Sequence, residues 1–320
     1  DPIGSRGLGD VYKRQIVMVM AIISTQISKN FFLSIQRDSY IDFKNHSLQL
    51  LLSSEKEAIQ SIQKEIVSSN QKLTNKDPVL NQSYFFSNEL ATIQVDVSDA
   101  SNCFNLNSIF IKTGDGVQIK KDNKEWLERL LRLKGVDAPE IESFIDQLID
   151  WVDPDNQPLN FGAENYFYIG PLSPIKQYTP KRLLSNLSEI KSFPVLDQVD
   201  FNKISNNLCV LPGILNQSIN VNTLNNTHKN LIASFFDEEN LEFIESQILD
   251  IPENGYDSVN EFSNKISQSV SWPSQVLSIN SKTLLISTKV YNQTFSNQLD
   301  SLVILDISNS AKVLNRDFSL

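Results

Sequence analysis

The sequence has few of the residues that most enzymes and zinc sites depend on. It contains only two histidines, His46 and His228, which lie far apart, and only two cysteines, Cys103 and Cys209. No His-Glu-x-x-His motif, Gly-x-Ser-x-Gly motif or phosphate-binding glycine loop is present. The two cysteines are too distant in the chain for a zinc or redox motif. We therefore expect a protein that is not an enzyme.

Positive charge is also scarce. Lysine and arginine together number 28, against 38 aspartates and glutamates, so the formal net charge is −10 and the isoelectric point is about 4.8. Nucleic-acid binding depends on basic side chains that neutralise phosphates. The charge balance therefore argues against a nucleic-acid partner. The composition is otherwise that of a globular protein, and 320 residues suffice for two domains with separate cores.

Glycine and proline are absent from residues 16–77, which predicts one long helix. Its first eight residues, Ile16 to Ile23, are all apolar. A membrane-spanning helix needs about 20 apolar residues, so this run is expected to be the end of a longer span if the native start is missing. The alternative is a plain soluble helix whose first turns are buried in a core. Apolar residues then recur at three- and four-residue steps, the pattern of an amphipathic helix lying on a sheet: Leu48, Leu51, Leu52, Ile59, Ile62 and Ile66.

Residues 1–15 differ in character from the predicted helix. They contain three glycines and one proline, and no capping pattern precedes the apolar run. We interpret them as a non-native leader that is not part of the fold. The alternative is a genuine short polar tail.

Strand patterns flank a long helical stretch. Residues 91–98 alternate between apolar and polar side chains, as in a half-buried strand. Because strand patterns return after Trp272-Pro273, we expect the helices between them to form an inserted domain within one sheet, not a tandem domain. The helices are predicted at about 125–133, 140–152, 180–192, 197–206, 223–235, 237–249 and 257–267, and the later strands at 276–280, 282–290, 299–307 and 312–318.

An acidic loop follows the predicted helix at 140–152. Counted from Asp153, acidic side chains stand at positions 1, 3 and 12 (Asp153, Asp155 and Glu164), with Gln157 at position 5. An EF-hand loop places its side-chain oxygens at the same positions, but it needs glycine at position 6, where this chain has Pro158. The sequence therefore predicts an oxygen-rich calcium loop that is not an EF-hand. The alternative is a helix C-cap with a solvated turn.

The preceding Asp150 is a candidate for a further calcium ligand or for a supporting group. The acid stands one helical turn before the predicted loop. The aromatic residues that follow the loop are read as core packing and not as a substrate platform: Phe161, Tyr166, Phe167 and Tyr168.

Four motifs occur in the same order as in a known family. Together they resemble the type II secretion system protein K family of minor pseudopilins, and the resemblance covers nearly the whole chain after residue 16. The motifs are Phe104-Asn105-Leu106-Asn107; Asp150-Trp151-Val152-Asp153-Pro154-Asp155 with Pro158, Gly162-Ala163-Glu164 and Tyr168; Ser188-Glu189-Ile190; and Leu211-Pro212-Gly213 followed by Ile219-Asn220-Val221-Asn222-Thr223.

The resemblance implies a pilin-like α+β fold, in which a long N-terminal helix packs on an antiparallel sheet. Residues 16–103 and 272–320 would form this part, and residues 104–271 an inserted all-α domain of the helix-hairpin-helix type. It also implies a structural protein at the tip of the pseudopilus, joined to the minor pseudopilins I and J. A single span would anchor the chain in the bacterial inner membrane. The globular part would lie in the periplasm, with secreted cargo as a further contact.

The first part of the long helix is the predicted contact with these partners. Residues 16–35 carry more apolar surface than one side of a sheet requires, and a bundle with partner helices would bury it. The expected contact residues are Ile27, Phe31, Phe32 and Ile35.

The cysteines leave two states open. In an extracytoplasmic protein, a disulfide between Cys103 and Cys209 would connect the start of the inserted domain to its middle. Two buried free thiols would fit the sequence equally well.

A DNA-binding protein of the DNA-uptake type is the alternative function. Residues 219–223 also resemble the opening of its helix-hairpin-helix domain. Such domains bind phosphate through a glycine-rich hairpin, whereas the turn at 236–239 is acidic and lacks glycine. We therefore favour the pseudopilin, because an acidic turn repels phosphate and a shared fold does not imply a shared function.

Overall fold

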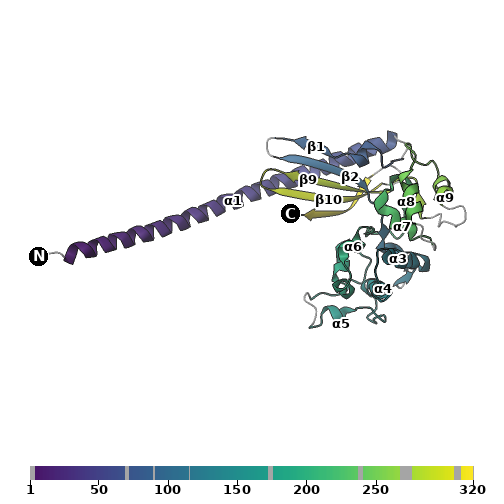
Figure 1. Ribbon diagram of the computed structural model, residues 1–320, viewed down its shortest axis with the longest axis horizontal. Helices are drawn as coiled ribbons and strands as arrows, with labels where there is room; N and C mark the ends of the chain where they lie inside the picture. The colour runs from purple at the N-terminus through teal and green to yellow at the C-terminus, as the bar shows by residue number, and fades with distance from the viewer. Residues whose placement is uncertain are drawn as a thin grey trace.

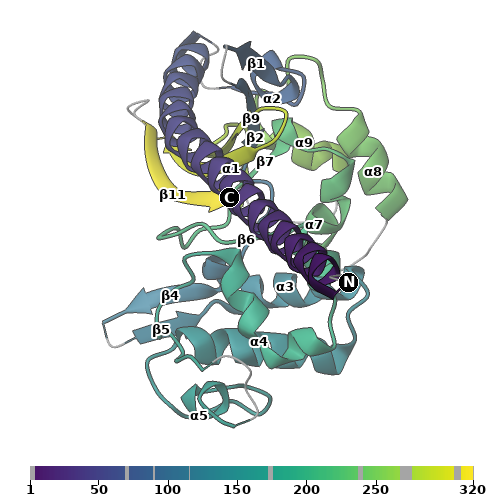
Figure 2. The same cartoon turned by 90° about the vertical axis from the view of Figure 1, so that its left-hand side faces the viewer.

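One long helix projects from a mixed α/β body (Figure 1). Figure 1 shows that the shorter helices gather at the end of the molecule far from the N-terminus, and Figure 2, seen from the N-terminal side, shows many of them below the sheet. Residues 4–15 of the expected leader form the first turns of the long helix. The computed structural model describes residues 4–68, 72–88, 91–114, 116–171, 176–236, 241–266, 276–305 and 311–319.

Helix α1 (Gly4–Ser68) divides into a free half and a packed half. The packed half lies on the sheet through the buried side chains of Leu51 and Ile62. Leu48 and Leu52, which belong to the same predicted stripe, are exposed. The stripe is wider than the sheet can cover, so only one side of it is buried.

Five antiparallel strands form the sheet, in the order β1-β2-β9-β10-β11. Strand β2 pairs with β9 over its whole length, so segments from before and after the insertion are neighbours in the middle of one sheet. This arrangement confirms the predicted pilin-like α+β class with an inserted helical region. The elements are α2 (Pro78–Asn81), β1 (Tyr84–Ser87), β2 (Thr92–Asp99), β9 (Thr283–Tyr291), β10 (Ser296–Leu305) and β11 (Ala311–Ser319).

The inserted region is mainly helical and also contains three short two-stranded ladders. Strands of two to four residues are too short to show a period of two, so the sequence predicted none of them except β8, which lies within the predicted strand at 276–280. The helices are α3 (Lys121–Leu133), α4 (Ala138–Val152), α5 (Asn165–Tyr168), α6 (Phe201–Ser205), α7 (Lys229–Ala233), α8 (Leu241–Leu249) and α9 (Val259–Ile266). The ladders pair β3 (Phe104–Asn105) with β6 (Leu208–Cys209), β4 (Phe110–Thr113) with β5 (Gly116–Ile119), and β7 (Ile219–Asn220) with β8 (Leu277–Ser278).

Two predicted helices, at 180–192 and 223–235, are broken into shorter pieces. The first keeps only a 3-10 turn, and the second divides into two 3-10 turns and α7. Asparagine side chains explain both breaks, because they bond to nearby backbone in place of the helix. The side chain of Asn186 accepts from the Ser188 amide at 2.8 Å, and that of Asn225 accepts from the Thr227 amide at 3.0 Å. Residues 237–240 of the next predicted helix lie outside the described residues.

The chain leaves and re-enters the sheet at adjacent points. The Ala100 amide donates to the Thr283 carbonyl at 2.9 Å. The predicted strand at 276–280 is the short β8, which pairs with β7, and its Val276 and Leu277 belong to the core of the insert. The return to the sheet therefore lies nearer Thr283 than the predicted residue 272.

This topology predicts that the pilin-like part folds without the insert. We expect a chain in which a short linker replaces residues 102–281 to unfold cooperatively in urea, because the five strands and α1 keep their own core. Circular dichroism against urea concentration would check this. A broad, non-cooperative transition, with the isolated residues 102–281 folding normally, would show that the sheet depends on the insert.

A disulfide joins Cys103 to Cys209, with 5.7 Å between the two Cα atoms. Cys103 immediately precedes β3, and Cys209 ends β6, the strand that pairs with β3 in parallel. The disulfide therefore links the two strands of one ladder and joins residues 106 positions apart in the chain. The structure therefore selects the disulfide over two free thiols.

We expect the Cys103→Ser/Cys209→Ser double variant to lose about 4 kcal/mol of unfolding free energy. A cross-link that closes a loop of about 100 residues restricts the unfolded chain by roughly this amount. Urea denaturation of the oxidised protein and of the variant would measure the loss. Adding a reductant should destabilise the native protein by a similar amount and leave the variant unchanged. Equal stabilities without reductant would contradict the prediction.

Candidate metal centre in the loop after helix α4

Helix α4 positions the loop, and its ends follow from the sequence. Asp137 and Glu140 form a reciprocal capping box, and Pro139 occupies the first turn, where its missing amide costs nothing. Apolar residues at helical spacing bury one face in the core of the insert. The helix stops at Asp153, whose backbone is extended as expected before Pro154.

Polar side chains of α4 hold the loop that follows. Asp150 is fully buried, and both of its carboxylate oxygens accept from the Leu159 amide at 3.2 Å. Asp146 accepts from the Phe161 amide at 3.1 Å, and Gln147 donates to the Phe161 carbonyl at 3.2 Å. These contacts tie the backbone of Leu159 and Phe161 to α4, so they fix the course of the chain from 159 to 161.

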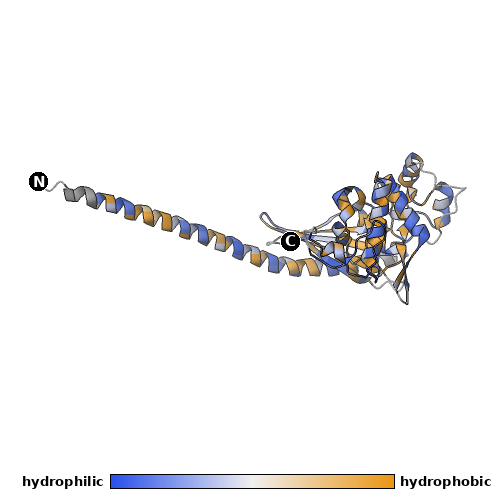
Figure 3. Cartoon of the chain, turned by 90° about the horizontal axis from the view of Figure 1, so that it is seen from below, coloured by the Kyte–Doolittle hydropathy of each residue, from blue (hydrophilic) through white to orange (hydrophobic). Residues whose placement is uncertain are grey.

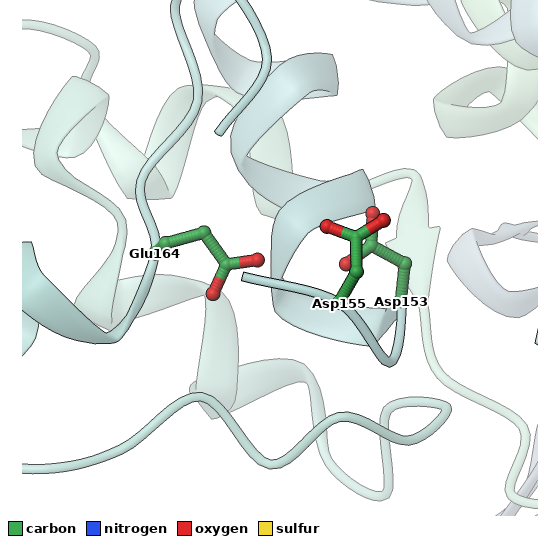
Figure 4. Close-up of side chains that lie close together, drawn as sticks. All are labelled: Asp153, Asp155 and Glu164. Atoms are coloured by element: carbon green, nitrogen blue, oxygen red, sulfur yellow. The ribbon is translucent and has the colours of Figure 1, made fainter. Parts of the chain in front are cut away.

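Asp153, Asp155 and Glu164 come together (Figure 4). One carboxylate oxygen from each lies within 4.8 Å of those of the other two. Asp155 accepts from the Gln157 amide at 2.8 Å, which closes a turn, and Glu164 accepts from the Asn165 amide at 3.2 Å at the start of α5. The spacing of 1, 3 and 12 therefore does bring three predicted residues to one place.

The predicted fourth residue, Asp150, lies outside this group of three. Its carboxylate is directed at the Leu159 amide and packs against Gly162. A Cβ atom on Gly162 would approach the Asp150 Oδ2 atom to 1.9 Å, which no side chain can do. Asp150 thus holds the backbone of the loop by accepting from the Leu159 amide. Glycine is required at position 162 because the chain passes directly over the buried Asp150 carboxylate.

We expect Gly162→Ala to lower the unfolding free energy by about 3 kcal/mol. The new methyl group must push the Asp150 carboxylate away from the Leu159 amide. The variant therefore loses stability both through steric overpacking and through the loss of this hydrogen bond. Gly114→Ala is the matched control, because nothing lies within 4 Å of its added Cβ. Urea denaturation of the two variants would compare them, and equal losses would contradict this role of Gly162.

Burial and mutual repulsion disfavour the charges of this loop. Burial, then the neighbouring Asp155, Asp150 and Glu164 carboxylates, raise the pKa of Asp153 to about 7. Burial also raises the pKa of Asp150 to about 6 and that of Glu164 above its usual range. Ordinary polar contacts in the loop therefore leave its negative charge poorly compensated.

Two oxygens of the cluster have no hydrogen-bond partner among the described residues. They are Oδ1 of Asp153 and Oε1 of Glu164, and both are buried. Glu164 is only 1% exposed, so its unpaired oxygen does not face bulk solvent. A set of oxygen donors with buried, unpaired carboxylate oxygens suits a hard cation such as Ca²⁺, whereas zinc sites favour nitrogen and sulfur.

The loop is closed by contacts that the sequence did not reveal. Asn165 Oδ1 accepts from both the amide and the hydroxyl of Thr179, at 2.7 and 2.9 Å. The Asn165 amide group donates to Asn156 at 3.2 Å. These partners are 9 and 14 residues apart in the chain, and no local pattern marks such a pair.

The predicted helix contacts lie on the free half of α1, where every side chain from residue 10 to residue 33 is exposed. Ile27, Phe31 and Phe32 are 62%, 66% and 67% exposed, and Ile35 is 49% exposed. Figure 3 shows apolar residues spread along this projecting segment. An 18-residue window of α1 has a mean hydropathy of 1.6, so the helix is long and apolar enough to cross a membrane.

A long helix with a projecting apolar half, packed on an antiparallel sheet, defines a pilin-like subunit. In this subunit a large helical region, carrying an acidic loop, interrupts the sheet. The family described as type II secretion system (T2SS), protein K, matches residues 102–213, which include that loop. Over these residues the chain is similar to the type II secretion system protein K family.

Relatives with that name are also similar to the chain. A type II secretion system protein K of Escherichia coli K12 is 22% identical over 234 residues, covering 72% of this chain and 70% of that protein. The protein K of Pectobacterium carotovorum is 30% identical over 150 residues, covering 44% of this chain and 42% of its own length. The comparisons give no support to the DNA-binding alternative.

The fold has a solved counterpart. In the crystal structure of the GspK-GspI-GspJ complex from enterotoxigenic Escherichia coli, one chain matches with a TM-score of 0.72 and 21% identity. The match covers 86% of this chain and 96% of that chain. At this identity the likeness shows the fold alone.

Proposed function

We propose that this protein is a minor pseudopilin that caps the tip of a type II secretion pseudopilus, in a complex with minor pseudopilins of the I and J types. The observation that carries the proposal is the free half of α1. It exposes large apolar side chains along a helix that no other described element covers. The solved relative is named as part of a complex with GspI and GspJ, which supports partners of this kind.

Burial of the free half in a helix bundle explains its composition. Contiguous exposed apolar surface is an aggregation hazard for a lone soluble protein and marks an interaction or membrane site. Apolar burial contributes about 25 cal/mol per Å², so a few large side chains can stabilise a bundle by several kcal/mol before association costs. Partner helices from two other pseudopilins would supply that burial.

The insert supports a position at the end of the fibre. It lies at the end of the molecule far from the N-terminus (Figure 1), so it would project beyond the bundle of N-terminal helices. A subunit with such a bulky head leaves no space for another above it in a narrow fibre. The apolar N-terminal part of α1 would anchor the chain in the inner membrane before assembly, with the sheet and insert in the periplasm.

We further propose that the loop after α4 binds Ca²⁺ through Asp153, Asp155 and Glu164. The observations that support the ion are the three converging carboxylates and the two buried oxygens without a partner. A bound divalent cation would supply the missing positive charge and fix the ends of α4 and α5 relative to each other. Asp150 would contribute by holding the loop backbone at Leu159.

Co-purification tests the assembly directly. The tagged full-length chain would be expressed with the I and J pseudopilins of the same secretion system and extracted in mild detergent. We expect the three to elute together from an affinity column and to remain together on size exclusion. The major pseudopilin of the same system, expressed in place of I and J, is the control for nonspecific helix association. Elution of the chain alone would contradict the proposed function.

A further inference from the structure

Lys181 places its ammonium group on the backbone of the acidic loop. The Nζ atom donates to the Asp155 carbonyl, to the Pro154 carbonyl at 3.3 Å and to Asn156 Oδ1 at 2.6 Å. All three acceptors lie within the three residues that follow Asp153. Backbone carbonyls and amide oxygens of this kind are common Ca²⁺ ligands, so the ammonium occupies positions that a hard cation would favour.

The backbone at Lys181 is unusual. Its φ is +48°, and among the described residues it is the one non-glycine position with a positive φ. This left-handed conformation is unfavourable for lysine and persists only when the surrounding structure holds it. Contacts on either side do so: the Thr179 amide donates to Asn165 at 2.7 Å, and Arg182 donates to Glu189 at 3.3 Å. These contacts therefore hold Lys181 in a backbone conformation that lysine does not favour.

The charge of the ammonium acts on the carboxylates. Burial and neighbouring acids raise the pKa of Asp153, and Lys181 opposes that rise. Lys181 likewise opposes the rise in the pKa of Glu164 that burial causes. The lysine is thus a partial counter-ion for the same charges that the proposed calcium ion would neutralise.

We propose that Lys181 is a built-in counter-cation of the calcium loop, which supports the loop when calcium is absent and lowers its affinity for calcium. This inference rests on the proposed calcium site. A fixed positive charge beside the carboxylates stabilises the ion-free loop and repels an incoming divalent cation. Lys181 therefore sets the calcium concentration at which the loop becomes occupied, and it is a positioning residue and not a ligand.

The test compares calcium binding to the full-length protein and to Lys181→Met. We expect Lys181→Met to melt at a lower temperature than the native protein in EDTA. We expect it to bind Ca²⁺ about fivefold more tightly by isothermal titration calorimetry, because removing one nearby charge in a solvated site changes the affinity by roughly this factor. Lys181→Arg keeps the charge, and Lys112→Met removes the charge of a second lysine, which lines the same surface hollow as Lys181. Both controls should bind Ca²⁺ as the native protein does.

Lys181→Asn separates the loss of charge from any folding defect in Lys181→Met. Asparagine tolerates a positive φ, and it also removes the charge. We expect it to show the same tighter binding. A purely structural lysine would give unchanged or weaker Ca²⁺ binding in Lys181→Met and Lys181→Asn, and this result would overturn the inference. If the native protein itself shows no Ca²⁺ binding and no change in melting temperature with Ca²⁺, the calcium site fails, and the inference fails with it.

Discussion

Removal of calcium will lower the melting temperature of this protein by about 10 °C. An ion that binds only the folded state stabilises it by about 4 kcal/mol when its concentration is 1,000 times the dissociation constant. For a unit the size of the insert, each 1 kcal/mol shifts the melting temperature by about 2–4 °C. Differential scanning fluorimetry in millimolar Ca²⁺ and in EDTA would measure the difference. Equal melting temperatures in the two buffers would contradict the proposed site.

Asp153→Asn gives a more specific test, because we expect it to raise the stability of the ion-free protein and to remove the stabilisation by Ca²⁺. Asp153 is partly buried beside three other acids, so replacing its charge relieves repulsion in the ion-free protein. The variant should therefore melt at or above the native temperature in EDTA and yet gain nothing from Ca²⁺. Glu142→Gln is the control, since Glu142 is an exposed acid on α4 outside the loop. A variant that still responds fully to Ca²⁺ would place the ion elsewhere.

Phe31→Ser/Phe32→Ser will abolish co-purification with the I and J pseudopilins while leaving the globular part folded. Both phenylalanines are about two-thirds exposed on the free half of α1, so serine there disturbs no internal packing. A buried phenylalanine contributes about 2 kcal/mol or more to an interface, so the pair should weaken assembly more than a hundredfold. Co-purification in detergent, with circular dichroism of the variant alone, would measure both outcomes.

Phe85→Ser/Phe86→Ser is the matched control. These residues form a second exposed phenylalanine pair, on the edge strand β1, at 59% and 57% exposure. We expect this variant to assemble normally. If it loses its partners while Phe31→Ser/Phe32→Ser keeps them, the interface lies on the sheet edge, and the free half of α1 serves only as a membrane anchor.

Local patterns in the sequence predicted the regular parts of the fold. The long helix, β2, α3, α4 and the last three strands each span eight or more residues with a repeating apolar pattern, and the structure places elements there. The predicted helices at 180–192 and 223–235 failed for a physical reason. The side chains of Asn186 and Asn225 accept hydrogen bonds from nearby amides, and these bonds compete with the helix. The spacing of apolar residues does not reveal this competition.

The candidate site was predictable only in part. The spacing of Asp153, Asp155 and Glu164 depends on a single loop, so the sequence could suggest their convergence, which the structure shows. The role of Asp150 depends on the path of the loop over Gly162, and the role of Lys181 depends on acceptors about 25 residues away. Contacts of this kind form only when the chain folds back on itself, and no periodicity or motif within a short window encodes them.

The position of this protein in the fibre tests the central claim most directly. Pseudopili can be assembled with the tagged full-length chain and imaged by electron microscopy after gold labelling of a tag in the insert, at the exposed turn that contains Gly114. A cap predicts one label per fibre, always at the same end. Labels repeated along the length of the fibre would contradict the claim, because they would show that subunits stack above this one.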